Sequence, residues 1–246
     1  MSEDLKKADL ECHAKPRPGK ISVTVTKPAE TSRDLSLAYS PGVAEPVREI
    51  AREPELAYRY TTKGNLVAVI SDGTAILGLG NLGALASKPV MEGKGVLFKK
   101  FADVDVFDIE VDATDVDLFV QTVKAIAPTF GGINLEDIKA PEAFEIERRL
   151  KEELDIPIMH DDQHGTAVVV LAALLNATRF SGLLLNISTV GIIGPGAAGM
   201  GIRNLLPPYG VRNLNGSDLD EEASERLAAA GGNTERLDEA QNEHNE

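Results

Sequence analysis

Two pairs of adjacent carboxylates have the residue types and positions of a metal site. Glu136-Asp137 and Asp161-Asp162 each follow a short apolar stretch and precede a helical pattern. Such side chains gather where neighbouring parallel strands end, and carboxylate oxygens are ligands that Mg²⁺ and Mn²⁺ prefer. Aspartate is also an effective helix N-cap, so capping without any metal is the alternative that the spacing leaves open.

His160 and His164 flank the second acidic pair and raise the question of zinc. Two histidines four residues apart on one helix can share a zinc ion. However, His160 closes the apolar stretch Ile156–Met159, and we expect the following helix to begin near Thr166. The two rings then share no helical face, and the sequence offers no obvious third nitrogen or sulfur ligand. We therefore do not expect zinc.

A glycine-rich loop comes late in the chain and fits the dinucleotide fingerprint G-x-G-x-x-G. It consists of Gly194, Pro195, Gly196, Ala197, Ala198 and Gly199. The fingerprint needs a preceding strand, a helix whose N-terminal amides face a pyrophosphate, and an acidic residue about 20 positions further on. We expect the strand over Thr189–Ile193 and the helix over Ala197–Leu206. Asp218 lies 19 residues beyond Gly199, so all three conditions are met.

A second match to the same pattern, Gly78 to Gly83, lacks this context. Ser71-Asp72-Gly73-Thr74 interrupts the strand before it, and we expect Pro89 to cut short the helix after it. For these glycines we expect a tight structural turn lining a cleft.

Lys94 and Tyr39 are candidates for proton transfer. Lys94 stands between Gly93 and Gly95, where a bulk-free backbone lets an ammonium group approach a small substrate and burial could lower its pKa. An ordinary solvated lysine is the alternative. Tyr39 precedes the turn at Pro41, and packing of its ring against the domain is the alternative to a chemical role.

Elements of two kinds alternate along the chain and must position these residues. Strand-length apolar runs are separated by helical patterns over Asp117–Ala127 and Pro141–Leu154, which predicts an α/β fold with parallel sheets. A long apolar helix over Thr166–Phe180 is expected to connect two domains, and residues 1–35 are expected to form an irregular arm. The predicted strands are Leu66–Ile70, Val96–Phe98, Val104–Val111, Ile156–Met159 and Val190–Ile193.

Charge and hydropathy exclude several classes of protein. The net charge is −14 with no basic stripe, so we expect no nucleic-acid partner. The longest apolar run, Ala167–Leu175, falls well short of the roughly 20 residues that span a bilayer. No apolar segment follows the mixed charges at the amino end, and Cys12 is the single cysteine, so we expect no membrane and a cytoplasmic location.

The acidity is concentrated at the carboxyl end of the chain. Residues 218–246 hold ten acidic and two basic side chains, a net charge of −8, which leaves −6 for the rest. The last fifteen residues, 232–246, have Leu237 as their one large apolar side chain, so we expect this end to be disordered.

Taken in order, five sequence motifs resemble the bacterial type of malic enzyme, from about Lys15 to Asn176. They are Ser36-Leu37-Ala38-Tyr39-Ser40-Pro41-Gly42-Val43, Ser71-Asp72-Gly73-Thr74-Ala75-Ile76-Leu77-Gly78-Leu79-Gly80-Asn81, Lys88-Pro89-Val90-Met91-Glu92-Gly93-Lys94-Gly95, Phe130-Gly131-Gly132-Ile133-Asn134-Leu135-Glu136-Asp137 and His160-Asp161-Asp162-Gln163-His164-Gly165-Thr166-Ala167. Animal-type members carry an arginine where this chain has Ala75, so the carboxylate clamp must differ here.

The resemblance implies a role for each candidate. Glu136, Asp137 and Asp162 would ligate Mg²⁺ or Mn²⁺, which also holds malate. Lys94 would take the proton from the C2 hydroxyl, with Asp161 pairing with it and tuning its pKa. Tyr39 would then protonate C3 after decarboxylation.

The resemblance also implies the organisation of the chain and its cofactor. We expect an N-terminal substrate domain over residues 1–160 and a partial, Rossmann-like NAD(P)-binding domain over residues 161–246, truncated relative to the family. Pro195 stands where the family has a small residue and removes one amide donor from the loop. Asp218 favours NAD, because a carboxylate there repels a 2′-phosphate, while Arg212 nearby leaves NADP open.

The implied function is oxidative decarboxylation of malate to pyruvate by an NAD(P)-dependent homo-oligomer, a dimer or higher. Two alternatives stay open. The chain could be an inactive fragment or dimerisation module, or it could convert malate to lactate as a malolactic-type enzyme does.

Overall fold

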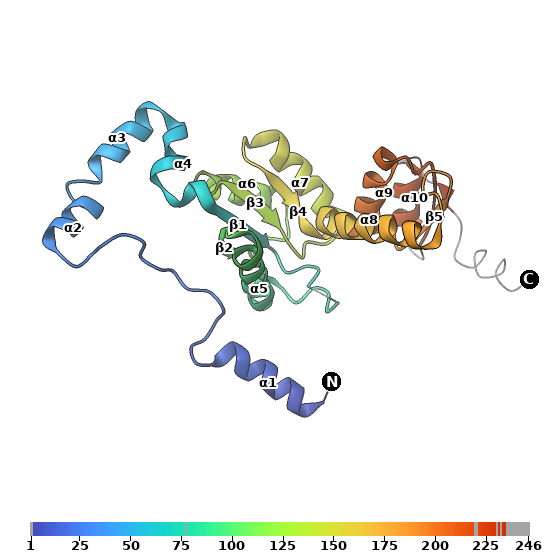
Figure 1. Cartoon of the computed structure of the whole chain (residues 1–246), viewed down its shortest axis with the longest axis horizontal. Helices are drawn as coiled ribbons and strands as arrows, with labels where there is room; N and C mark the ends of the chain where they lie inside the picture. Colours follow the sequence, from blue (N-terminus) through green and yellow to red (C-terminus); the bar gives the residue numbers. More distant parts are fainter. Residues whose placement is uncertain (1, 77, 219–220, 230, 232, 235–246) are drawn as a thin grey trace, which may run out of the picture. The chain divides into compact units, whose positions relative to one another are not determined.

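The structure is a computed structural model that describes residues 2–76, 78–218, 221–229, 231 and 233–234 (Figure 1). The chain divides into two compact units. The first comprises Met1–Asn134 and Lys151–Ile158, and the second comprises Leu135–Leu150 and Met159–Glu246. The expected domain boundary at residue 160 stays a prediction.

The amino-terminal part of the first unit is more helical than predicted. Helix α1 (Glu3–Ala14) lies in the segment expected to be irregular, and helix α2 (Ser32–Ala38) begins in it. The residues between the two helices have no helix or strand. Both helices begin at capping side chains, because Ser2 accepts from the Leu5 amide and Thr31 forms a capping box with Asp34. Helices α3 (Ala44–Arg52) and α4 (Ala57–Tyr60) follow.

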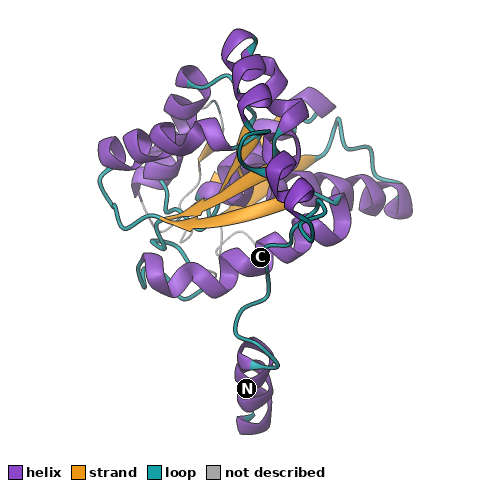
Figure 2. Cartoon of the chain, turned by 90° about the vertical axis from the view of Figure 1, so that its left-hand side faces the viewer, coloured by secondary structure: helices purple, strands orange, loops and turns teal. Residues whose placement is uncertain are grey.

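A four-stranded sheet has the order β2-β1-β3-β4. Its strands are β1 (Leu66–Ser71), β2 (Asp105–Glu110), β3 (Gly132–Leu135) and β4 (Ile158–His160). Strands β1 and β2 pair in parallel, with Leu66 opposite Asp105 and Ser71 opposite Glu110. Helices α5 (Ala84–Ala102), α6 (Val116–Ile126) and α7 (Glu142–Glu153) connect the strands in turn, which confirms the α/β prediction. Figure 2 shows strands with helices around them.

The strand predicted over Val96–Phe98 is wrong, because these residues form a turn of helix α5. Their helix also runs through Pro89, which was expected to end it. Four buried residues lie on one face of α5 and pack it against its neighbours. Their helical spacing extends over three turns, so the apolar run of three residues does not reveal it by itself. The buried residues are Ala84, Ser87, Met91 and Gly95.

The second unit contains the parallel sheet β5-β6-β7 and, besides most of α7, the helices that follow β4. The strands are β5 (Thr189–Ile193), β6 (Asn213–Ser217) and β7 (Asn233–Thr234), and the helices are α8 (Asp161–Ser181), α9 (Ala197–Leu205) and α10 (Glu221–Ala229). Buried side chains from α8, from the segment between α9 and β6 and from β6 itself form a hydrophobic core in this unit. They are Leu171, Leu206, Val211 and Leu214.

Two expectations for this unit need correction. Helix α8 begins at Asp161 and not near Thr166, because Asp161 and Asp162 place two negative charges in the first turn, where the helix dipole favours them. The predicted disorder of residues 232–246 is wrong for Asn233 and Thr234, which pair with β6. The remainder of that segment lies outside the described residues.

No helix in the described part of the chain combines the length and the apolar character that a membrane crossing requires.

Candidate functional site

Three of the predicted metal ligands lie together in the second unit. Glu136, Asp137 and Asp162 each offer a carboxylate oxygen, and these atoms all lie within 4.8 Å of one another. The first two residues directly follow β3, and Asp162 lies in the first turn of α8. Asp137 has a left-handed backbone (φ 53°), and its amide donates to Asp162 Oδ2 over 3.0 Å.

Burial and composition of this carboxylate cluster suit a divalent cation. Glu136 and Asp137 are buried, with 5% and 3% of their surface exposed. Like charges at such distances repel unless a cation or proton compensates them, and the all-oxygen donor set fits Mg²⁺ or Mn²⁺.

The helix-capping alternative does not account for the acidic pairs. The N-cap of α8 is His160, which makes no side-chain capping hydrogen bond, and Asp161 and Asp162 are already helical. Glu136 and Asp137 precede the start of α7 at Glu142 by several residues.

The glycine-rich loop has the form that the dinucleotide fingerprint requires. It joins β5 to α9, and the Gly194 amide donates to the Ser217 carbonyl over 3.0 Å. Gly194 has a positive φ of 85°, and side-chain carbons built at Gly194 and Gly196 meet nothing within 4 Å, which leaves space for a ligand. At Gly199 such a carbon would lie 2.4 Å from the Gly194 carbonyl oxygen, so this turn requires glycine. Asp218 follows directly after β6.

Helices α8 and α9 approach each other at the level of their backbones. A side-chain carbon on Gly201 would lie 2.2 Å from the Gln163 carbonyl oxygen. Gln163 is adjacent to Asp162, and α9 begins within the glycine-rich loop. The candidate metal ligand and the candidate cofactor loop therefore stand on directly packed helices.

The first glycine match forms a tight turn, as predicted, while the cleft that it was expected to line stays a prediction. Ile76 and Gly80 form an isolated bridge, and Gly78 and Gly80 have positive φ angles. Upstream, Asp72 Oδ1 accepts from the Thr74 amide over 3.0 Å. A side-chain carbon on Gly73 would lie 2.2 Å from the Gly83 carbonyl oxygen, so the turn closes tightly on itself.

The predicted proton-transfer residues fall into different units. Lys94 is half-buried on α5, and Tyr39 ends α2 with 75% of its surface exposed, so its ring is not packed against the unit as the structural alternative requires. Asp161 opens α8 in the second unit with the carboxylate cluster. The roles of Lys94, Asp161 and Tyr39 around one substrate stay predictions.

A charged cluster on the first unit was not singled out by the sequence analysis. Lys88 on α5 pairs with Asp108 and, over 3.3 Å, with Glu110 Oε2. Burial raises the pKa of Glu110, and the neighbouring Asp108 charge adds to this. Burial lowers the pKa of Lys88, but its hydrogen bond to Asp108 and the two acidic charges raise it overall. The signal in the sequence was the i, i+2 spacing of the acids, which places both on one strand face.

Comparison with known proteins matches both parts of the chain to family models. Residues 18–151 match the malic enzyme N-terminal domain, and residues 163–229 match the malic enzyme NAD-binding domain.

Individual relatives are similar over most of this chain. The chain is 61% identical over 220 residues to an NADP-dependent malic enzyme of Halomonas elongata, covering 89% of this chain and 52% of the relative. It is 56% identical over 214 residues to an NAD-dependent malic enzyme of Rhizobium meliloti, covering 87% of this chain and 28% of the relative. A crystal structure of malic enzyme from Pyrococcus horikoshii Ot3 superimposes with a TM-score of 0.85 at 52% identity, covering 88% of this chain and 51% of that one. The chain thus spans about half or less of the length of these relatives.

Proposed function

This chain belongs to the malic enzyme family, and on that premise we propose that it carries out the metal-dependent oxidative decarboxylation of malate to pyruvate and CO₂, with reduction of NAD(P)⁺. The observation that supports this most directly is the carboxylate cluster of Glu136, Asp137 and Asp162, whose oxygen atoms lie within 4.8 Å. The cluster stands on the same compact unit as the glycine-rich loop.

The proposed reaction assigns one task to each candidate residue. Glu136, Asp137 and Asp162 would hold Mg²⁺ or Mn²⁺, which supplies Lewis-acid chemistry at the substrate oxygens when bound. Lys94 would take the proton of the C2 hydroxyl, and bound NAD(P)⁺ would supply the acceptor for the hydride that leaves C2, so that malate is oxidised to oxaloacetate. Asp161 would pair with Lys94 and stabilise the ammonium group that forms when Lys94 accepts the proton. Loss of the C4 carboxylate as CO₂ leaves an enolate, and Tyr39 protonates its C3 to give pyruvate.

The experiment that tests this function measures malate-dependent formation of NADH or NADPH in the presence of Mn²⁺. We expect turnover by the chain and none by Lys94→Ala, while Lys100→Ala, an exposed position on the same helix, behaves as the wild type. Pyruvate is the expected product, and lactate would indicate the malolactic-type reaction instead. Turnover no greater than that of Lys94→Ala would favour an inactive fragment or dimerisation module.

Asp218 supports a preference for NAD over NADP. Asp218 follows the carboxyl end of β6, where a ribose-binding carboxylate belongs in this kind of sheet, whereas Arg212 precedes the amino end of the same strand. The arginine is therefore near Asp218 in sequence only, and five strand residues separate the two.

We expect Asp218→Asn to raise the affinity for NADPH relative to NADH about tenfold, because the substitution removes a charge that repels the 2′-phosphate. Titration of both reduced cofactors, followed by nicotinamide fluorescence, measures this without turnover. Glu225→Gln, an exposed charge change on α10, is the matched control. Tighter binding of NADPH than of NADH by the wild type would contradict the argument from Asp218.

The assembly and location of the protein follow as further parts of the proposal. We expect a homo-oligomer, a dimer or higher, that acts on malate in the cytoplasm without nucleic acid or membrane. Size-exclusion chromatography with light scattering tests the assembly.

A further inference from the structure

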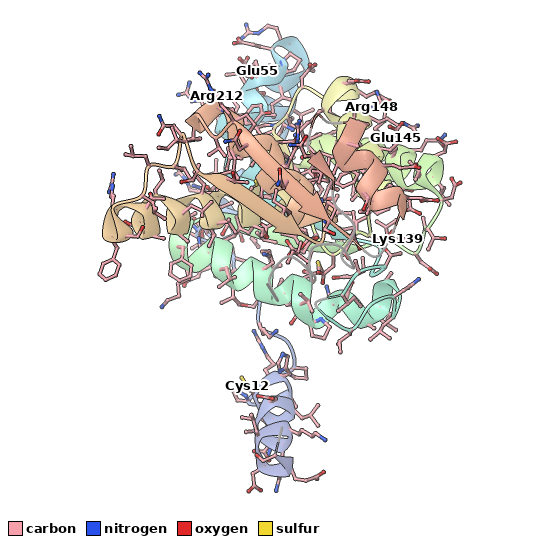
Figure 3. All side chains as sticks on the ribbon, turned by 90° about the vertical axis from the view of Figure 1, so that its right-hand side faces the viewer. Cys12, Glu55, Lys139, Glu145, Arg148 and Arg212 are labelled. Carbon is pink, nitrogen blue, oxygen red and sulfur yellow. The ribbon has the colours of Figure 1, made fainter. Side chains whose placement is uncertain are left out.

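Helix α7 carries a buried carboxylate whose place the reaction does not explain. On the exposed side of the helix, Glu145 and Arg148 pair through two hydrogen bonds, with Arg148 Nη2 2.7 Å from Glu145 Oε1 (Figure 3). Glu147 points the other way and has only 7% of its surface exposed. It shares the buried face with Ala143, Ile146 and Leu150. A buried carboxylate is costly unless its oxygens accept hydrogen bonds, so its partners matter.

Three partners of Glu147 lie in the segment around the second acidic pair. Glu147 Oε1 accepts from the His160 amide over 3.0 Å and lies 2.8 Å from His164 Nε2. Glu147 Oε2 accepts from Gln163 Nε2 over 3.3 Å. These three residues lie on either side of Asp161 and Asp162, so the Glu147 side chain contacts both the end of β4 and the first turn of α8.

The same network reaches the carboxylate of Asp162. Gln163 Nε2 and Nδ1 of the fully buried His160 lie 3.0 Å apart, within hydrogen-bond distance. His160 Nε2 lies 3.0 Å from Asp162 Oδ2. The same Oδ2 accepts a hydrogen bond from the Asp137 amide, so the Asp162 carboxylate is in contact with groups on both sides.

We infer that Glu147 is a positioning residue for the carboxylate cluster, acting through Gln163 and His160 on Asp162. The inference rests on the proposed function, because it assumes that the cluster binds Mg²⁺ or Mn²⁺. Partners of this kind hold metal ligands in their binding orientation, and their loss typically lowers metal affinity 10- to 100-fold.

Replacement of Glu147 by Gln tests the inference in the full chain after removal of metal. Mn²⁺ alone is titrated, and the free ion is measured by electron paramagnetic resonance, so that no turnover is needed. Both oxygens of the Glu147 carboxylate accept hydrogen bonds. Whichever way the new amide is turned, its NH₂ group faces one of these donors and cannot accept a hydrogen bond from it. We expect Glu147→Gln to weaken Mn²⁺ binding about 10- to 100-fold. Glu145→Gln, on the exposed face of the same helix, is expected to bind like the wild type.

A second variant keeps the test valid if Glu147→Gln does not fold. Gln163→Leu removes the side chain that joins Glu147 to the ring of His160, while the hydrogen bond from the His160 amide to Glu147 remains. We expect this variant to weaken Mn²⁺ binding to a similar extent. Unfolding curves in urea show whether the variants are folded during the titration.

The outcomes separate this inference from the proposed function. If the wild type binds Mn²⁺ and both folded variants bind it equally well, Glu147 has a structural role only and the inference is overturned. If the wild type binds Mn²⁺ no better than a chain with Glu136, Asp137 and Asp162 all replaced by Ala, the proposed metal site fails, and the inference fails with it.

Discussion

Replacement of Glu136 by Gln is expected to stabilise the metal-free protein and to remove most of its affinity for Mn²⁺. The two effects have opposite signs because the clustered carboxylates repel one another without a cation and would together bind a cation when it is present. At the 4.8 Å limit of the cluster, two full charges repel by about 3–4 kcal/mol at an effective dielectric constant of about 20. Removal of one of these charges relieves part of the repulsion, so we expect a gain of about 1 kcal/mol in the free energy of unfolding without metal.

The loss of metal affinity is the larger effect of this substitution. Gln keeps the shape of Glu but offers a neutral oxygen, and we expect the dissociation constant of Mn²⁺ to rise about 100-fold, or about 2.7 kcal/mol. At a Mn²⁺ concentration 100 times the wild-type dissociation constant, the metal then stabilises the wild type by about 2.7 kcal/mol and the variant by about 0.4 kcal/mol.

Urea unfolding with EDTA and with Mn²⁺ measures both effects in one series. Glu145→Gln is the matched control, because its charge is lost on the exposed face of α7, in the same unit. A variant that loses stability in EDTA and is still stabilised fully by Mn²⁺ would show that Glu136 is structural and that the cation binds elsewhere.

Sequence alone could predict the local features whose signals are carried by neighbouring residues. The glycine-rich loop is one example, because strand, turn and helix follow one another within 17 residues, and β5 and α9 begin where expected. The carboxylate pairs are another, because each directly follows a strand. The start of α8 was harder to predict, because glycine is unfavourable inside a helix and Gly165 nevertheless lies within α8.

Other features depended on burial, which the sequence does not report. Glu147 stands in a run of charged residues on α7, and only the packed structure separates it from Glu145, two positions earlier. The run Val96–Phe98 had the composition of a strand, but Met91 and Gly95 bury one face of a helix there. The relation of Lys94 to Asp161 depends on how two units are arranged, and it stays a prediction.

Gly201→Ala is expected to destabilise the second unit by about 2–3 kcal/mol and to weaken dinucleotide binding about tenfold. The new side-chain carbon would lie 2.2, 2.7 and 2.9 Å from the carbonyl oxygen, carbonyl carbon and Cα of Gln163. All three are backbone atoms, so no rotation of a side chain can relieve the clash. Helix α9 must move away from α8, and the loop amides at its N-terminus move with it.

The affinities of this variant for NADH and for Mn²⁺ show which of the two helices is displaced. If α9 shifts, NADH binding weakens while Mn²⁺ binding is preserved, because Asp162 stands on α8. If the first turn of α8 shifts instead, Mn²⁺ binding weakens as well. Gly191→Ala is the matched control, since a side-chain carbon at Gly191 in β5 meets nothing within 4 Å. Equal stability and equal NADH affinity for Gly201→Ala and Gly191→Ala would refute the close packing of the two helices. We expect α9 to shift, because Glu147 on the buried face of α7 accepts hydrogen bonds from the start of α8 and so holds it in place. Among the described residues, no comparable hydrogen bond joins a side chain of α9 to another element.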